Sequence, residues 1–94
     1  MSNTAPPEDK FVKINGLNIH YVDWGGNASQ TLLFVHGQGS NGHAFDHIAP
    51  SFRDDFRVLA IDQRGHGDSD HTQEGYAVKL FAQELAGFAE ALGI

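Results

Sequence analysis

A run of apolar residues that passes directly into a glycine-rich turn constrains the fold of this chain more than any other feature. Residues 32–35 (Leu-Leu-Phe-Val) are all apolar, which is typical of a strand covered on both faces, as in a parallel sheet. The turn after this run carries Gly37, Gly39 and Gly42. Without side chains the backbone there can approach a ligand, and its N–H groups and the helix start behind them favour negative charge. We therefore predict a turn that stabilises an anion and opens a helix.

The segments around this turn predict an α/β arrangement that begins with a hairpin. Asn15-Gly16 lies between two alternating apolar runs, which is the pattern of a two-residue hairpin. After the glycine-rich turn we expect a short helix that starts near His43 and is limited by Pro50. The expected order is hairpin strands at 11–14 and 17–22, the apolar strand, the short helix, a strand at 56–61 and an amphipathic helix at 78–92. The apolar stripe of the last helix consists of Val78, Phe81, Leu85, Phe88 and Leu92.

Composition limits the class of protein and its partners. The chain has 94 residues, a net charge of −6 and no cysteine, so disulfides and thiolate metal sites are excluded. It has no basic patch, which argues against nucleic acid and membrane surfaces as partners, and we expect a cytoplasmic protein. Residues 1–9 are polar and are expected to form a disordered lead-in to a domain section at 10–94. Because this section contains few strands, we expect an incomplete domain whose sheet has an open edge.

Two loop motifs and the hairpin together resemble the N-terminal part of the α/β-hydrolase fold. His36-Gly37-Gln38-Gly39 follows one strand, and Asp62-x-Arg64-Gly65-x-Gly67-x-Ser69 follows the next. The ordered set is similar to that family over residues 11–94. The resemblance implies the first part of an α/β-hydrolase sheet, a hairpin followed by β-α-β-α. It also implies a parent hydrolase that acts on esters, lactones or related acyl compounds.

The resemblance implies roles for residues in both loops. The backbone N–H of Gln38 would be one donor of the oxyanion hole, which stabilises the negative charge that acyl transfer places on a carbonyl oxygen. His36 would anchor its loop, and Asp62 and Arg64 would tie the two loops together. The remaining positions would support the shape of the loops: Gly37, Gly39, Gly65, Gly67 and Ser69.

The catalytic residues of the family are expected to lie outside these 94 residues. The family's nucleophile stands in a Gly-x-Ser-x-Gly turn beyond the 78–92 helix, and the acid and base come later still. Ser40 and Ser69 each match only part of that pattern, and neither is expected to be a nucleophile. His66, Asp68 and Ser69 are expected to be solvated loop residues, because a triad is set by geometry across a fold and not by sequence proximity. We expect the chain alone to be inactive and to use no cofactor.

Gly39 bears on the class of reaction. Epoxide hydrolases and haloalkane dehalogenases of the same fold usually have proline at this position, so the resemblance favours a serine hydrolase. The expected partner of the complete enzyme is a small acyl substrate, whose identity depends on later segments.

Two other classes of protein explain part of the same sequence. Gly37-x-Gly39-x-x-Gly42 after a strand is the dinucleotide-binding pattern, and Asp62 ends the next strand where a ribose-binding acid is expected. That interpretation leaves the hairpin and the 64–67 segment unexplained, and Pro50 shortens the helix that would face the pyrophosphate. The other class is a non-enzymatic interaction module, which would pair with a partner or with a second copy through its open sheet edge.

The histidines outside the two loops predict no metal site. His43 and His47 stand one helical turn apart with Asp46 between them, but a zinc site normally needs a third ligand. We therefore predict a solvated helix face there. His20 alternates with its apolar neighbours along a strand, so it is expected on the outer face of the sheet.

Overall fold

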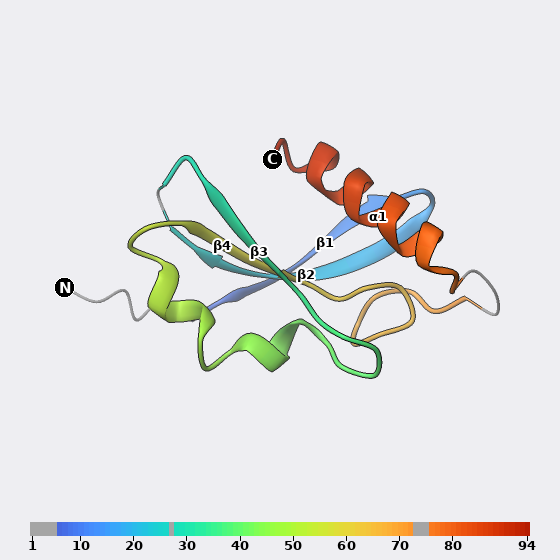
Figure 1. The fold of residues 1–94 in the computed structure, drawn as a ribbon, viewed down its shortest axis with the longest axis horizontal. Coiled ribbons are helices and arrows are strands. Elements are labelled where there is room, and N and C mark those ends of the chain that lie inside the picture. The colour runs from blue at the N-terminus through green and yellow to red at the C-terminus, as the bar shows by residue number, and fades with distance from the viewer. Residues whose placement is uncertain (1–5, 27, 73–75) are drawn as a thin grey trace.

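The computed structural model describes residues 6–26, 28–72 and 76–94. They form one mixed four-stranded sheet in the order β1-β2-β4-β3, with an α-helix on one face and two short 3₁₀ helices on the other (Figure 1). Each face of the sheet has its own apolar cluster. One cluster lies under the α-helix around Leu59 and Phe88, and the other lies under the 3₁₀ helices around Val58 and Ala60.

A β-hairpin forms the first half of the sheet, as the Asn-Gly signal predicted. Strands β1 (Glu8–Ile14) and β2 (Leu17–Gly25) pair antiparallel, and Asn15 and Gly16 both have positive φ at the turn, 50° and 83°. Positive φ at both central residues gives the turn a twist that matches the twist of the strands. Glu8 and Asp9 belong to β1, so the strand begins within the predicted lead-in. Residues 1–5 lie outside the described residues.

The two parallel strands differ in burial. β4 (Arg57–Ile61) lies between β2 and β3, and residues 58–61 are buried. β3 (Thr31–Val35) pairs with β4 alone among the described residues, and Val35 is 40% exposed. Leu33 and Phe34 pack into the clusters on opposite faces. The prediction that both faces of β3 are covered is therefore correct only in part, because residues 31–34 are half-buried and Val35 is exposed.

A short helix begins near His43 as expected, but it is a 3₁₀ helix, and a second 3₁₀ helix follows it. Helix η1 (Gly42–Phe45) begins after Asn41, whose side chain accepts a hydrogen bond from the His43 N–H. Helix η2 (Ala49–Phe52) contains Pro50 in its first turn. Proline has no N–H and its ring clashes with the carbonyl four residues earlier, so a continuous α-helix through this segment is disfavoured.

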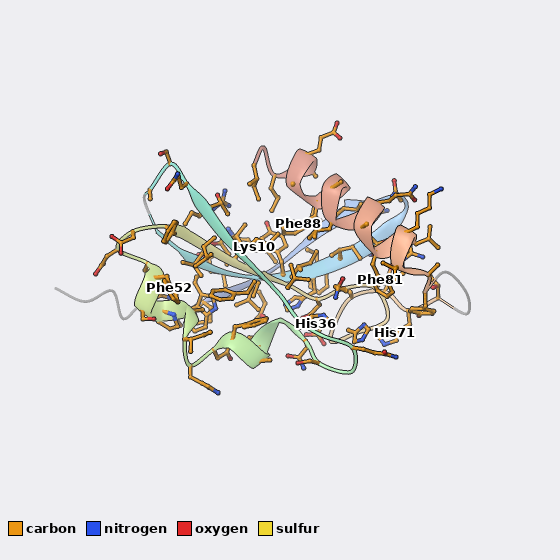
Figure 2. The ribbon with its side chains drawn as sticks, in the orientation of Figure 1. Lys10, His36, Phe52, His71, Phe81 and Phe88 are labelled. Atoms are coloured by element: carbon orange, nitrogen blue, oxygen red, sulfur yellow. The ribbon has the colours of Figure 1, made fainter. Side chains whose placement is uncertain are left out.

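The C-terminal helix α1 (Val78–Ala91) packs across the hairpin, as Figures 1 and 2 show. Phe88 is fully buried and meets the Tyr21 ring edge-on with ring centres 5.2 Å apart. Leu85 and Leu92 pack against the same cluster. Val78 is 85% exposed, so the predicted apolar stripe is wrong at its first position.

None of the helices in the described residues is long and apolar enough to cross a membrane.

Candidate active site

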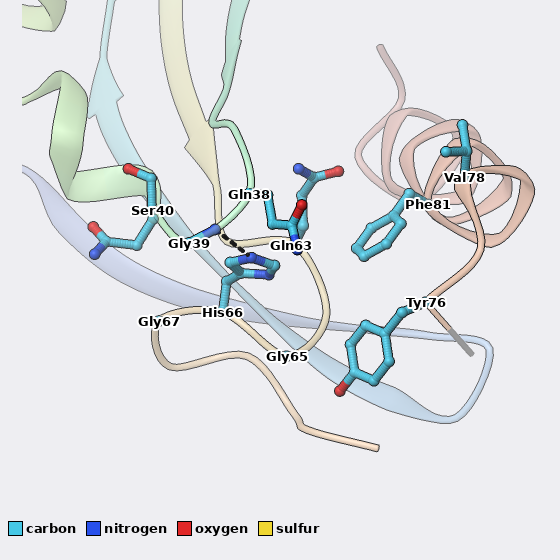
Figure 3. Close-up of a pocket in the computed structure, with 11 residues that line it drawn as sticks. Gln38, Gly39, Ser40, Gln63, Gly65, His66, Gly67, Tyr76, Val78 and Phe81 are labelled. Carbon is cyan, nitrogen blue, oxygen red and sulfur yellow. Dashed lines mark hydrogen bonds between the residues drawn. The ribbon is translucent and has the colours of Figure 1, made fainter. Parts of the chain in front are cut away.

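Two loops and the start of α1 enclose a pocket at the end of the parallel strands. The first loop (residues 36–41) follows β3, and the second loop (residues 62–70) follows β4. Because β3 and β4 are parallel, both loops begin at the same end of the sheet, where these two strands end (Figure 1). The pocket has a volume of about 750 Å³ (Figure 3). Its lining includes Gln38, Ser40, Gln63, His66, Tyr76 and Phe81.

His36 joins the first loop to the second. Its Nε2 accepts a hydrogen bond from the Gln63 N–H at 2.9 Å, and its Nδ1–H donates to the Gly37 carbonyl at 2.7 Å. The Gln63 side chain donates in return to the His36 carbonyl at 2.9 Å. The ring is 4% exposed. A neutral imidazole with its proton on Nδ1 satisfies both ring contacts, so His36 is placed where an anchor of the loop would be.

The backbone of the first loop leaves donors unused, and the Gln38 N–H is one of them. The N–H groups of Gly39 and Ser40 donate to His66 Nε2 at 3.0 Å and to the Gly37 carbonyl at 3.2 Å. Within the described part of the chain, the Gln38 N–H donates no hydrogen bond. Gly39 adopts φ of +82°, a left-handed conformation that favours glycine. The residue that the family resemblance singled out therefore lines the pocket, and its N–H donates no hydrogen bond within the described residues.

His66 is a pocket residue whose contacts the sequence did not reveal. Figure 3 shows its ring beside Gln38 and Gly39, and the ring is only half-buried. Its Nδ1–H donates to the Arg64 carbonyl at 3.0 Å, which leaves Nε2 as the acceptor for the Gly39 N–H. Its ring centre lies 4.8 Å from that of His36. No local pattern could have identified this residue, because its partner is 27 residues away.

Asp62 connects the two loops and the hairpin. It is 1% exposed. Its Oδ1 accepts from the Gly42 N–H at 2.5 Å, and its Oδ2 accepts from the Asp68 N–H at 2.9 Å. Oδ2 also lies 2.6 Å from His20 Nδ1. Both oxygens of the buried carboxylate accept hydrogen bonds, so they are not available to bind the hydroxyls of a ribose. In addition, the helix after the first loop is a 3₁₀ helix and not an α-helix. Both observations argue against the dinucleotide-binding interpretation.

Ser69 and His20 correct two predictions. Ser69 is 2% exposed rather than solvated. Its Oγ accepts from the His20 N–H at 2.7 Å and donates to the Asp62 carbonyl at 2.6 Å. His20 is fully buried, so it does not lie on an outer face. The prediction assumed that only one face of β2 is covered. In the structure α1 covers one face of the sheet and the 3₁₀ helices cover the other.

Arg64 links the second loop to α1. Its Nε–H donates to Glu84 Oε2 at 2.8 Å, and Glu84 is 3% exposed. The hydrogen bond to Glu84, helped by the charge of its carboxylate, raises the pKa of Arg64 above its usual value. Gly65 turns beside this pair with φ of +75°, and a side chain there would collide with Tyr76. The Tyr76 hydroxyl itself hydrogen-bonds to the backbone of Thr72, and these bonds lower the pKa of Tyr76.

Comparison with known proteins identifies the family. The family model described as "alpha/beta hydrolase fold" matches residues 30–94. A bifunctional esterase/perhydrolase of Acinetobacter calcoaceticus is 33% identical over 81 residues, which cover 85% of this chain and 29% of that protein. Epoxide hydrolase 4 of Mus musculus is 31% identical over 84 residues, which cover 87% of this chain and 23% of that protein. The crystal structure of a bacterial membrane phospholipase A superposes with a TM-score of 0.87 at 32% identity, covering 94% of this chain and 29% of that one.

The chain belongs to the α/β-hydrolase fold family, which confirms the resemblance drawn from the two loop motifs. It spans less than a third of the length of each of these relatives. Its hairpin, mixed sheet and crossing helix correspond to a part of such a domain.

Proposed function

We propose that this chain supplies the first oxyanion-hole donor, the Gln38 N–H, to a hydrolase of esters or related acyl compounds. The unused N–H at the pocket is the observation that supports this most directly. An oxyanion donor must be held in place before charge develops, because reorganisation during the reaction would cost part of the stabilisation. The contacts from His36 to Gln63 and from Gly39 to His66 hold the loop on both sides of Gln38.

The conformation of Gly39 supports an acyl hydrolase within this family. Its φ of +82° cannot be adopted by proline, whose ring holds φ near −65°. The proline that the resemblance associates with epoxide hydrolases and dehalogenases would therefore require a different first loop. Sequence identity alone does not distinguish acyl hydrolysis from epoxide hydrolysis, because an esterase and an epoxide hydrolase match the chain at 33% and 31%.

The proposal places the nucleophile, acid and base outside these 94 residues. Both hydrogen-bonding functions of the Ser69 hydroxyl are engaged in buried contacts. Ser40 lines the pocket, but it lies on the same turn as the proposed donor. We expect no hydrolysis of a p-nitrophenyl ester by the 94-residue chain, and turnover that survives repurification would contradict this part of the proposal.

A chimera tests the donor. The matching segment of the Acinetobacter esterase/perhydrolase is replaced by this chain, and ester hydrolysis is measured for the chimera and for two variants. Gln38→Pro removes the N–H and is expected to lower kcat by about 10²–10³-fold. Gln38→Ala retains the N–H and is expected to keep kcat within a few-fold. Equal activities of the two variants would show that the Gln38 N–H is not an oxyanion donor.

Amide hydrogen exchange on the unmodified chain provides a second test that does not depend on the chimera. The Gln38 amide is expected to exchange faster than the amide of Gly39, which donates to His66. Protection of the Gln38 amide would mean that the donor is already engaged.

A second candidate function is strand pairing through the open edge of β3. This strand pairs with β4 alone among the described residues, and it is apolar and partly exposed. Exposed edges of this kind recruit further strands. We infer that the isolated chain self-associates through β3, and sedimentation at increasing concentration tests this. Val35→Lys is expected to reduce association, whereas Phe11→Lys on the opposite edge strand β1 serves as the matched control.

A further inference from the structure

Three metal-ligating side chains from separate elements converge beside the hairpin. They are Asp9 of β1, His20 of β2 and His43 of η1. Asp9 Oδ1 lies 2.8 Å from His20 Nε2 and 3.0 Å from His43 Nε2. All three ligand atoms lie within 4.8 Å of one another. Two imidazoles and one carboxylate are a ligand set that zinc accepts in four-coordinate sites, with water in the fourth position.

The second nitrogen of each imidazole contacts a further carboxylate. His20 Nδ1 lies 2.6 Å from Asp62 Oδ2, and His43 Nδ1 lies 2.8 Å from Asp46 Oδ2. Metal-binding histidines usually make this outer contact, because it fixes the tautomer and the ring orientation so that the other nitrogen faces the ion. In both residues the outer contact engages Nδ1, and in both it directs Nε2 toward Asp9.

Burial and charge also suit a cation. The His20 ring is fully buried, whereas the side chains of His43 and Asp9 are 41% and 57% exposed. One ligand is therefore held rigidly, and the other two are open to solvent, which gives an ion a path into the site. With neutral imidazoles, Asp9, Asp46 and Asp62 leave the cluster negatively charged, and a divalent cation would offset that charge.

We propose that Asp9, His20 and His43 bind a zinc ion, with Asp62 and Asp46 orienting the two imidazoles. This set differs from the His43–His47 pair considered from the sequence, because the ligands come from three elements and His47 is absent from the cluster. The ion would fasten β1 and β2 to η1, the helix that follows the first loop. The proposal does not depend on the hydrolase function.

Zinc titration of the 94-residue chain tests the site. After treatment with a chelator and removal of that chelator, calorimetric titration with ZnCl₂ is expected to give one ion per chain. The ion is also expected to raise Tm, because a ligand that binds the folded state stabilises it. His43→Ala and Asp9→Asn change exposed side chains and are expected to abolish this binding. Asp46→Asn is expected to weaken it by about 10–100-fold.

His47→Ala is the matched control, since His47 is exposed in the same segment but is not in the cluster. It is expected to bind zinc like the unmodified chain. An amide NMR spectrum of each variant without metal establishes that it is folded. Absence of zinc binding, or binding that His43→Ala leaves intact, would overturn the proposal in favour of a purely hydrogen-bonded cluster. Loss of binding in His47→Ala would likewise overturn it in favour of a surface histidine pair.

Discussion

The two loops at the end of the parallel strands are held in different ways, although both are rich in glycine. The second loop is held by two of its own buried side chains, Asp62 and Ser69, which hydrogen-bond both to its backbone and to His20 of the hairpin. Residues 37–39 of the first loop are exposed, and the loop is held by contacts with the second loop, through His36 and through the Gly39 N–H on His66. The difference indicates that the second loop is the support and that the first loop presents its backbone to the pocket.

Among the tests of this difference, removal of the Asp62 carboxylate is expected to have the largest effect on stability. Asp62→Ala leaves the N–H groups of Gly42 and Asp68 without acceptors and leaves His20 Nδ1 without its carboxylate partner. We expect the free energy of unfolding to fall by about 3–5 kcal/mol in urea denaturation. Asp68→Ala changes an exposed side chain next to the buried Ser69 and is expected to stay within about 0.5 kcal/mol. Similar losses in both variants would contradict the supporting role of Asp62.

A pair of glycine substitutions compares the two loops directly. Gly67 and Gly39 both have positive φ, 52° and 82°. A Cβ at Gly67 would lie 2.1 Å from Asp62 Oδ2, whereas a Cβ at Gly39 would meet nothing within 4 Å. Gly39→Ala is therefore expected to cost about 1–2 kcal/mol from backbone strain alone. Gly67→Ala is expected to cost about 1–3 kcal/mol more, because the side chain also displaces Asp62.

Urea denaturation of both glycine variants provides the measurement. A Gly67→Ala variant as stable as Gly39→Ala would mean that the second loop shifts as easily as the first.

His36 tests how strongly the first loop depends on its anchor. His36→Ala removes the acceptor of the partly buried Gln63 N–H and is expected to cost about 1–3 kcal/mol. It should also speed amide exchange at Gln63. The exposed His71 provides the control, and His71→Ala is expected to change stability by less than about 0.5 kcal/mol. If the two variants are equally stable, contacts other than His36 hold the first loop.

The smallest expected effect lies away from both loops, at Asp23 of β2. Burial by itself would raise the pKa of Asp23, but hydrogen bonds from Lys10 and the Gly25 N–H, with the charges of Lys10 and Arg57, outweigh it and lower the pKa. The resulting stability is present above the unfolded pKa of about 3.9 and is lost as pH falls through the lower folded pKa.

Asp23→Asn removes this acid dependence. Because Lys10 is 39% exposed, the difference is expected to be at most about 1 kcal/mol. Urea denaturation between pH 7 and pH 3 measures it. The variant should lose less stability than the unmodified chain over the acid part of that range, and parallel curves would show that Asp23 contributes nothing.

Local signals predicted most of the fold. The Asn15-Gly16 turn, the apolar run at 32–35 and the periodicity of α1 each depend on neighbours in sequence, and each gave an element of the right type. The start of a short helix near His43 was predicted, but the local pattern did not show that this segment forms two 3₁₀ helices, one after the Asn41 cap and one at Pro50. Roles in the candidate site came from the family resemblance, and that of Gln38 remains a prediction.

The sequence by itself determined the family and the strand and helix types, because glycine spacing, hairpin chemistry and apolar periodicity act over a few residues. Only the tertiary structure decided that His20 is buried, that β3 lies at an edge and that His66 supports Gly39. It also brought Asp9, His20 and His43 together from three elements. The physical reason is that burial and side-chain convergence depend on which distant segments cover a residue, and no local pattern encodes that.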